Sequence, residues 1–214
     1  VLLLTSVLWD AQVHYQQNAF TNIVEWVLFT INYFRKRPDL KLVIRIHPAE
    51  VRNKLPSKQQ MVDEINSAYP NLPKNIMLLH PTHSVTSYEV ASRSNCCLIY
   101  STKMGVELSA KGIPNIVCGE AWIRNKGFAH DSSSKEEYVR LLDKIPNKIK
   151  MTPQQIVLAK KYAYHFFFRR MIPIECLEPA KGVPPYKISN NAVAIICKEN
   201  IDSLNCVTEG VMHE

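Results

Sequence analysis

The chain has 214 residues, of which 46% are hydrophobic and 21% charged, a composition typical of a globular protein and unlike that of a disordered one. Its net charge of +7 suits an acidic ligand or an anionic membrane surface, and without a basic stripe interleaved with aromatic residues we expect no nucleic acid as a partner. None of the six cysteines has C-x-x-C or zinc-site spacing, which favours a reduced cytosolic setting over a disulfide framework.

Apolar runs and helical periodicities alternate along the first 118 residues. The apolar run that opens the chain is too short to cross a membrane and predicts a first strand, and its abrupt start indicates a fragment of a longer protein. The predicted strands are 1–7, 42–46, 75–79, 96–100 and 115–118, and the predicted helices between them are 19–37, 58–69, 84–92 and 106–110. This alternation predicts an α/β fold with a doubly wound, Rossmann-like parallel sheet of about five strands.

Two further helices are predicted after the sheet, at 132–145 and 152–171, and a short one at 191–201. We therefore expect a Rossmann-like domain at 1–150, and a long aromatic helix with an irregular extension that packs on it at 151–214. The aromatic residues of 162–170 surround the helix nearly completely, which predicts a buried helix. A membrane or partner surface on a basic, aromatic helix is the alternative.

The stretch 96–131 contains a strand, a turn, a helix and a second strand, and the turn lies at the edge of the sheet where open α/β folds bind ligands. Ser101, Thr102 and Gly105 occur where the helix begins, and free backbone N–H groups there would face an anion. Glu107 follows one turn later, within reach of a sugar hydroxyl on the same ligand. The alternative is that the hydroxyls cap the helix and Glu107 is a solvated acid.

His47-Pro48 follows the second predicted strand at its carboxyl end. An imidazole at this position can donate to a phosphate oxygen, with Arg45 on the same strand face and Glu50 as a group that orients the ring. The alternative is a surface histidine at the start of a loop. His80-Pro81 repeats the dipeptide after the next strand, and adjacent strand ends would bring the two close together.

A glycine-containing loop follows the strand at 115–118. In this loop Lys126 can meet a phosphate, and Glu120 or Trp122 can meet a base or a sugar. An ordinary glycine-rich loop with no ligand is the alternative.

Three segments together, IRIHPAE, YSTKMGVELSAKGIPNIVCGEAWIRNKGF and AYHFFFRRMIPI, resemble the capsule polysaccharide biosynthesis proteins, a family that includes Kdo transferases. The resemblance covers about residues 1–174, and its most specific part is the S-T-x-x-G-x-E-x-x-x-x-G-x-P run. It implies the C-terminal, donor-binding half of a GT-B glycosyltransferase that uses a nucleotide-activated sugar, most simply CMP-Kdo. By this likeness His47 and the hydroxyls of Ser101 and Thr102 would meet the donor phosphate, and Glu107 the ribose.

The same resemblance sets the expected partners and location. The acceptor would be a glycan or glycolipid, and the N-terminal GT-B half that normally binds it is missing from the chain. We expect no metal and no cofactor other than the donor, and a cytoplasmic location with contact at the inner face of the bacterial membrane. Two alternatives stay open: an epimerase or polyol-phosphate transferase on the same fold, and a non-catalytic module that binds a membrane or partner.

Overall fold

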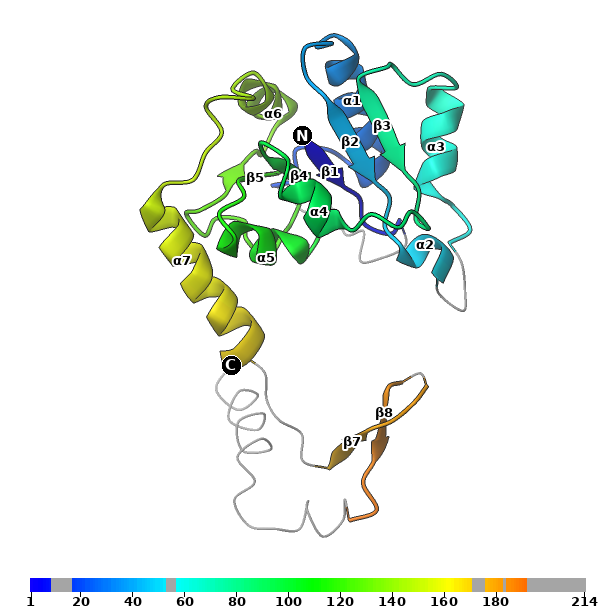
Figure 1. Cartoon of the computed structure of the whole chain (residues 1–214), viewed down its shortest axis with the longest axis vertical. Coiled ribbons are helices and arrows are strands. Elements are labelled where there is room, and N and C mark those ends of the chain that lie inside the picture. The colour runs from blue at the N-terminus through cyan, green and yellow to red at the C-terminus, as the bar shows by residue number, and fades with distance from the viewer. Residues whose placement is uncertain (9–16, 53–56, 171–175, 183, 192–214) are drawn as a thin grey trace. The chain divides into compact units, whose positions relative to one another are not determined.

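A computed structural model describes residues 1–8, 17–52, 57–170, 176–182 and 184–191. They divide into two compact units, Val1–Ala163 and a second that begins at Tyr164 (Figure 1). The first unit contains the predicted α/β fold. The polar sequence at 8–18, which follows the first predicted strand, also predicts a ligand-facing loop; this loop and the expected helix at 191–201 lie largely outside the described residues.

A six-stranded, all-parallel sheet forms the centre of the first unit, in the order β3-β2-β1-β4-β5-β6. Its strands are β1 (Leu2–Leu4), β2 (Leu42–Arg45), β3 (Ile76–Leu79), β4 (Cys97–Ile99), β5 (Asn115–Val117) and β6 (His130–Asp131). The doubly wound α/β fold is thus confirmed, with one strand more than expected. β6 has only two residues, too few to produce an apolar run in the sequence. The order reverses between β1 and β4, so the connections that leave their carboxyl ends go to opposite sides of the sheet and leave a crevice between them.

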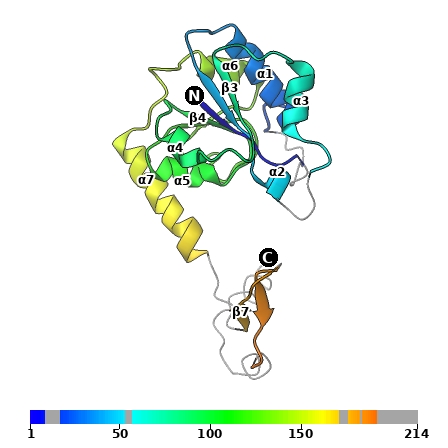
Figure 2. The same cartoon turned by 45° about the vertical axis from the view of Figure 1, so that its right-hand side comes forward.

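Helices cover both faces of this sheet. They are α1 (Ile23–Arg35), α2 (Ala49–Arg52), α3 (Met61–Ala68), α4 (Ser87–Ala91), α5 (Met104–Ala110), α6 (Lys135–Leu142) and α7 (Pro153–Tyr164). Figures 1 and 2 show α1, α3 and α6 on one side of the sheet and α4 and α5 on the other. Strand residues alternate accordingly: Leu98 belongs to the main hydrophobic core, whereas Ile99 lies within reach of α5.

Side-chain caps begin several helices. Thr86 caps α4 in a reciprocal arrangement with Glu89, and Ser134 caps α6. Asn22 caps α1 by accepting from the Glu25 amide at 2.8 Å. α2 was not predicted, because its four residues are too few to show a helical period.

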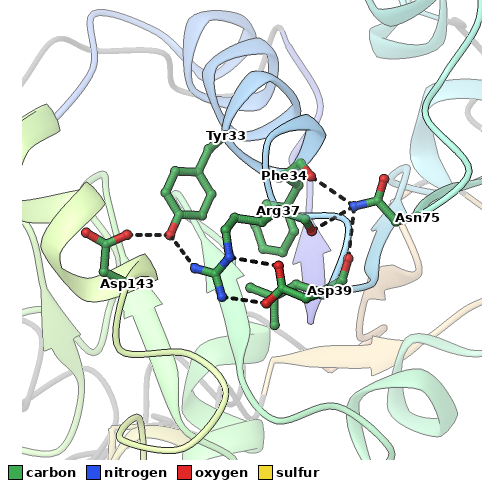
Figure 3. A network of polar contacts seen from close by, with 7 residues as sticks. Tyr33, Phe34, Arg37, Asp39, Asn75 and Asp143 are labelled. Carbon is green, nitrogen blue, oxygen red and sulfur yellow. Dashed lines mark hydrogen bonds and ion pairs between the residues drawn. The ribbon is translucent and has the colours of Figure 1, made fainter.

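A polar network holds the end of α1 and the start of β2 in place (Figure 3). The Asn75 amide nitrogen lies within hydrogen-bond distance of three backbone carbonyl oxygens, those of Phe34, Arg37 and Leu40, at 2.9–3.1 Å. Phe34 belongs to the last turn of α1, and Arg37 and Leu40 belong to the turn that follows it, so one side chain ties the end of the helix to the segment that leads into β2.

The aromatic segment after Pro153 differs from the predicted buried helix. α7 ends at Tyr164 and a π-helix, His165–Arg169, continues from it, and Ala159 is the only buried residue of the two. The prediction of a buried helix is therefore wrong for this segment. Within the first unit only one face of α7 has partners: Gln155 Nε2 donates to the Gly127 carbonyl at 3.2 Å, and Tyr162 Oη to the Trp122 carbonyl at 2.6 Å.

The second unit contains a short antiparallel hairpin of β7 (Leu177–Pro179) and β8 (Tyr186–Ile188). Cys96, Cys97 and Cys118 are buried in the sheet, as their apolar runs predicted, and burial raises the pKa of Cys118 to about 12. Among the described residues, no helix has both the length and the apolar character needed to cross a membrane.

Candidate functional site

A cleft of about 690 Å³ opens at the carboxyl edge of the sheet, where the strand order reverses. Its volume falls within the range of small-molecule sites, about 300–1,000 Å³. The segments that follow β1, β2, β4 and β5 all contribute to its wall. The lining residues are Ser6, Val7, His47, Ser101, Thr102, Lys103, Met104, Glu107, Glu120, Ala121 and Trp122.

Hydroxyl groups gather on either side of the switch point. Ser6 Oγ and Ser101 Oγ lie 3.1 Å apart, at the ends of β1 and β4. Thr102 Oγ1 accepts from the Met104 amide at 3.3 Å. The cap residue of α5 is Lys103, whose side chain makes no capping bond, so the expectation that Ser101 caps the helix is not met and Thr102 only partly fulfils it. The two hydroxyls therefore face the cleft more than they serve the helix.

His47 lies half-buried directly after β2, and two backbone contacts hold it in place. Its amide donates to Thr5 Oγ1 at 3.0 Å, and its ring Nδ1 accepts from the Ala49 amide at 3.1 Å. An acceptor at Nδ1 places the proton of the neutral ring on Nε2, which can then act as a donor. The fixed tautomer is the property that a phosphate-binding histidine needs.

Glu50 does not orient the His47 ring in the way that the sequence predicted. It is fully buried, and its Oε2 accepts from the Met61 amide at the start of α3, at 3.2 Å. Burial raises its pKa to about 7. The carboxyl group therefore belongs to the packing between α2 and α3.

Glu107 lines the cleft from α5, and Tyr88 of α4 donates a hydrogen bond to its Oε2. That bond and partial burial raise the pKa of Tyr88 above its usual value. The Lys111 ammonium lies over the Tyr88 ring, 4.4 Å from its centroid. A carboxylate held in this way can accept hydrogen bonds from a vicinal diol, such as that of a ribose, without first becoming ordered.

The loop after β5 brings Glu120 and Trp122 to the cleft, both exposed. Behind it, the buried Arg124 guanidinium donates to the carbonyls of Gly119, Gln17 and Ser132, at 2.6–3.1 Å. The loop is thus fixed from inside the fold. Trp122 presents a ring that is 46% exposed, large enough to stack on a base or sugar.

Six of the residues that the sequence predicted for the site line this cleft: His47, Ser101, Thr102, Glu107, Glu120 and Trp122. Arg45 does not line it. Its buried guanidinium donates to the carbonyls of His80 and His83, and it borders a smaller cavity of about 360 Å³ next to His47. Arg45 therefore holds the loop after β3.

Gly105 and Lys126 also have other roles. A Cβ at Gly105 would lie 2.6 Å from Ile99 Cδ1, so this glycine allows α5 to pack closely on β4. Lys126 is exposed, with its ammonium 6.0 Å from the centroid of the Tyr162 ring, and does not border the cleft. β2 and β3 are adjacent as expected, but the His80 side chain is exposed and lines neither cavity.

Five lining residues were not predicted: Ser6, Val7, Lys103, Met104 and Ala121. Ser6 had a detectable signal, since it is a small hydroxyl residue at the end of a buried first strand. The position of β1 beside β4 is what brings it to Ser101, and the order of strands cannot be obtained from the sequence periodicity.

No group of three or more His, Cys, Asp or Glu residues that could hold a metal ion occurs in the part of the chain that the structure describes. A comparison with models of known protein families gave no match, and a comparison with curated proteins gave none either. The resemblance to the capsule polysaccharide family therefore stays a prediction from the motifs.

Proposed function

We propose that this chain is the donor-binding domain of a glycosyltransferase that uses a nucleotide-activated sugar, CMP-Kdo being the first choice, in the synthesis of a capsule or related surface polysaccharide. The observation that carries the proposal is the cleft at the switch point, where His47, Ser101, Thr102 and Glu107 meet. The choice of CMP-Kdo, and of a glycan or glycolipid as acceptor, depends on the resemblance of the motifs.

In this proposal, different residues of the cleft would contact the phosphate and the nucleoside of the donor. The hydroxyls of Ser6, Ser101 and Thr102 and the Nε2 of His47 would donate to the phosphate, where negative charge increases as the bond to the sugar breaks. His47 is the residue to which we assign a catalytic role, because it can stabilise the leaving phosphate at the point of bond cleavage. These donors belong to the rigid ends of β1, β2 and β4, so little reorganisation is needed.

The nucleoside would occupy the other side of the cleft. Glu107, held by Tyr88, would accept from the ribose hydroxyls, and Trp122 would stack on the base or on the sugar. No step in this scheme needs a metal ion. Transfer itself would also need the acceptor groups that the resemblance assigns to the other GT-B half.

Calorimetric titration of the chain with CMP and with UDP tests the proposal. We expect CMP to bind more tightly, and His47→Ala to weaken its binding by about 1.5–3 kcal/mol, the scale of a hydrogen bond to a charged group. The matched control is His80→Ala, which removes an exposed imidazole from the other His-Pro dipeptide, outside the cleft.

The outcomes separate the parts of the proposal. A preference for UDP would keep the site and discard Kdo as the sugar. Equal losses in the two histidine variants, or binding of neither nucleotide, would contradict a donor site at His47.

A further inference from the structure

The positive charge of this protein is concentrated in one segment. Residues 144–170 contain seven of the 26 basic residues and none of the 19 acidic ones. The rest of the chain has 19 basic and 19 acidic residues and is neutral in sum, so this segment accounts for the whole net charge of +7. The function proposed for the cleft makes no use of it.

The same segment leaves apolar side chains exposed. In the first unit, Val157 and Leu158 of α7 are 52% and 44% exposed, with the exposed Lys160 and Lys161 just after them in the sequence. Val157 lies on the side of α7 away from Gln155 and Tyr162, the residues that contact the sheet domain, whereas Leu158 lies at the edge of the contact face, beside Gly127.

In the second unit the aromatic residues are more exposed still. Tyr164 and Phe168 are 60% and 69% exposed, and their rings form a pair with centroids 5.5 Å apart. Arg169 and Arg170 follow directly, both exposed. We call these four residues, Tyr164, Phe168, Arg169 and Arg170, the aromatic–arginine patch. Exposed aromatic rings next to exposed cations in the sequence are the combination that marks a surface for an apolar and anionic partner.

We propose that the aromatic–arginine patch binds the anionic surface of a lipid bilayer. Aromatic rings prefer the boundary between headgroups and acyl chains, and arginine pairs with lipid phosphates. The absence of any acidic residue from 144 to 170 favours a lipid surface, which is uniformly negative, over a protein partner with charges of both signs. Rings and guanidinium groups of this kind bind at the headgroup level, so the contact that we propose is a peripheral one.

Co-sedimentation of the full chain with vesicles tests this inference, using neutral phosphatidylcholine vesicles and vesicles in which part of the lipid is replaced by phosphatidylglycerol. We expect strong preference for the anionic vesicles, and weakening of that binding by high salt. Arg169→Gln/Arg170→Gln should lower the partition coefficient by roughly 30-fold, and Tyr164→Ser/Phe168→Ser by on the order of tenfold.

Two control variants match these changes elsewhere on the molecule. Lys41→Gln/Arg93→Gln removes two exposed charges outside the segment, and Tyr186→Ser removes an exposed aromatic residue from β8. Both should bind vesicles within about twofold of the unchanged chain. All variants alter exposed side chains, and circular dichroism before sedimentation checks that each is folded.

Equal binding to the two vesicle types, or equal losses in patch and control variants, would overturn the inference. So would a dimer in solution that the patch variants convert to monomers, because the patch would then cover a second copy of the chain. CMP binding by the patch variants should be unchanged, so this test and that of the donor site fail independently.

Discussion

Glu50 offers a test of the packing beneath the cleft, because its carboxyl group is fully buried and burial raises its pKa to about 7, from an ordinary value of 4.5. At pH values between these two pKa values, the Glu50 carboxyl group keeps a proton in the folded protein and has lost it in the unfolded chain. Stability therefore falls as the pH rises through this window, and levels off above it. At about 1.4 kcal/mol per pKa unit, the loss is roughly 3 kcal/mol.

The perturbation is Glu50→Gln, which keeps the acceptor for the Met61 amide and cannot ionise. The free energy of unfolding is measured by urea titration with circular dichroism at about pH 5 and pH 8. We expect it to fall between these pH values by roughly 3 kcal/mol more in the unchanged chain than in the variant. Any fixed cost of the new amide group is the same at each pH and cancels in this comparison.

Asp63→Asn is the control for this experiment. Asp63 is exposed, and its charge contributes a smaller increase to the pKa of Glu50. Its removal should leave most of the pH dependence in place. Parallel pH profiles for the unchanged chain and Glu50→Gln would refute the reasoning, since they would mean that Glu50 ionises normally in the folded protein.

Four further substitutions test the loops and ends that shape the site. Gly119→Ala should destabilise the fold by about 2–3 kcal/mol in urea titration, because the new methyl group would lie 2.6 Å from the ring of Tyr100. Gly105→Ala should destabilise it less, because the new methyl group would meet the ends of isoleucine side chains, which can move more easily than a ring. Arg124→Lys should lower the free energy of unfolding by about 3 kcal/mol, because an ammonium cannot reach all the carbonyls that the guanidinium contacts; a loss under about 1 kcal/mol would contradict that role. Asn75→Ala should cost about 1–3 kcal/mol, measured in the same way, and a neutral result would mean that water replaces the amide.

The sequence was most informative where one local rule decides the structure. The strands, the caps of α4 and α6 and the positions of Ser101, Thr102 and Glu107 after β4 all follow from apolar runs and short-range spacing. It was least informative where the outcome depends on the order of strands or on partners far along the chain. Ser6 meets Ser101 across 95 residues, and no periodicity encodes that contact.

The prediction of a buried helix at 162–170 was wrong for a different reason. An apolar helix is buried only if another element offers a face to cover it, and periodicity describes the helix without its neighbours. Tyr164 and Phe168 are large aromatic residues of the kind that usually lie in a protein core, but their side chains are exposed. This mismatch is what makes the segment informative, because the basic residues around it identify the chemistry that could cover it.

Arg45 and Arg124 both support loops at the ligand-binding edge of the sheet, although the sequence predicted a ligand contact for Arg45 and no role for Arg124. Both lie at the ligand-binding edge of the sheet, and both are buried, at 5% and 4% exposure. Each directs its guanidinium to backbone carbonyls, Arg45 to the loop after β3 and Arg124 to the loop after β5. A guanidinium has five N–H donors in a rigid plane, so one side chain can satisfy several carbonyls that have no place in a helix or sheet. Loops that carry a binding site need this support, because their backbone groups lack the partners that regular structure provides. An Arg45 variant that loses nucleotide binding would therefore not by itself identify a ligand contact. It would do so only if the free energy of unfolding stayed unchanged.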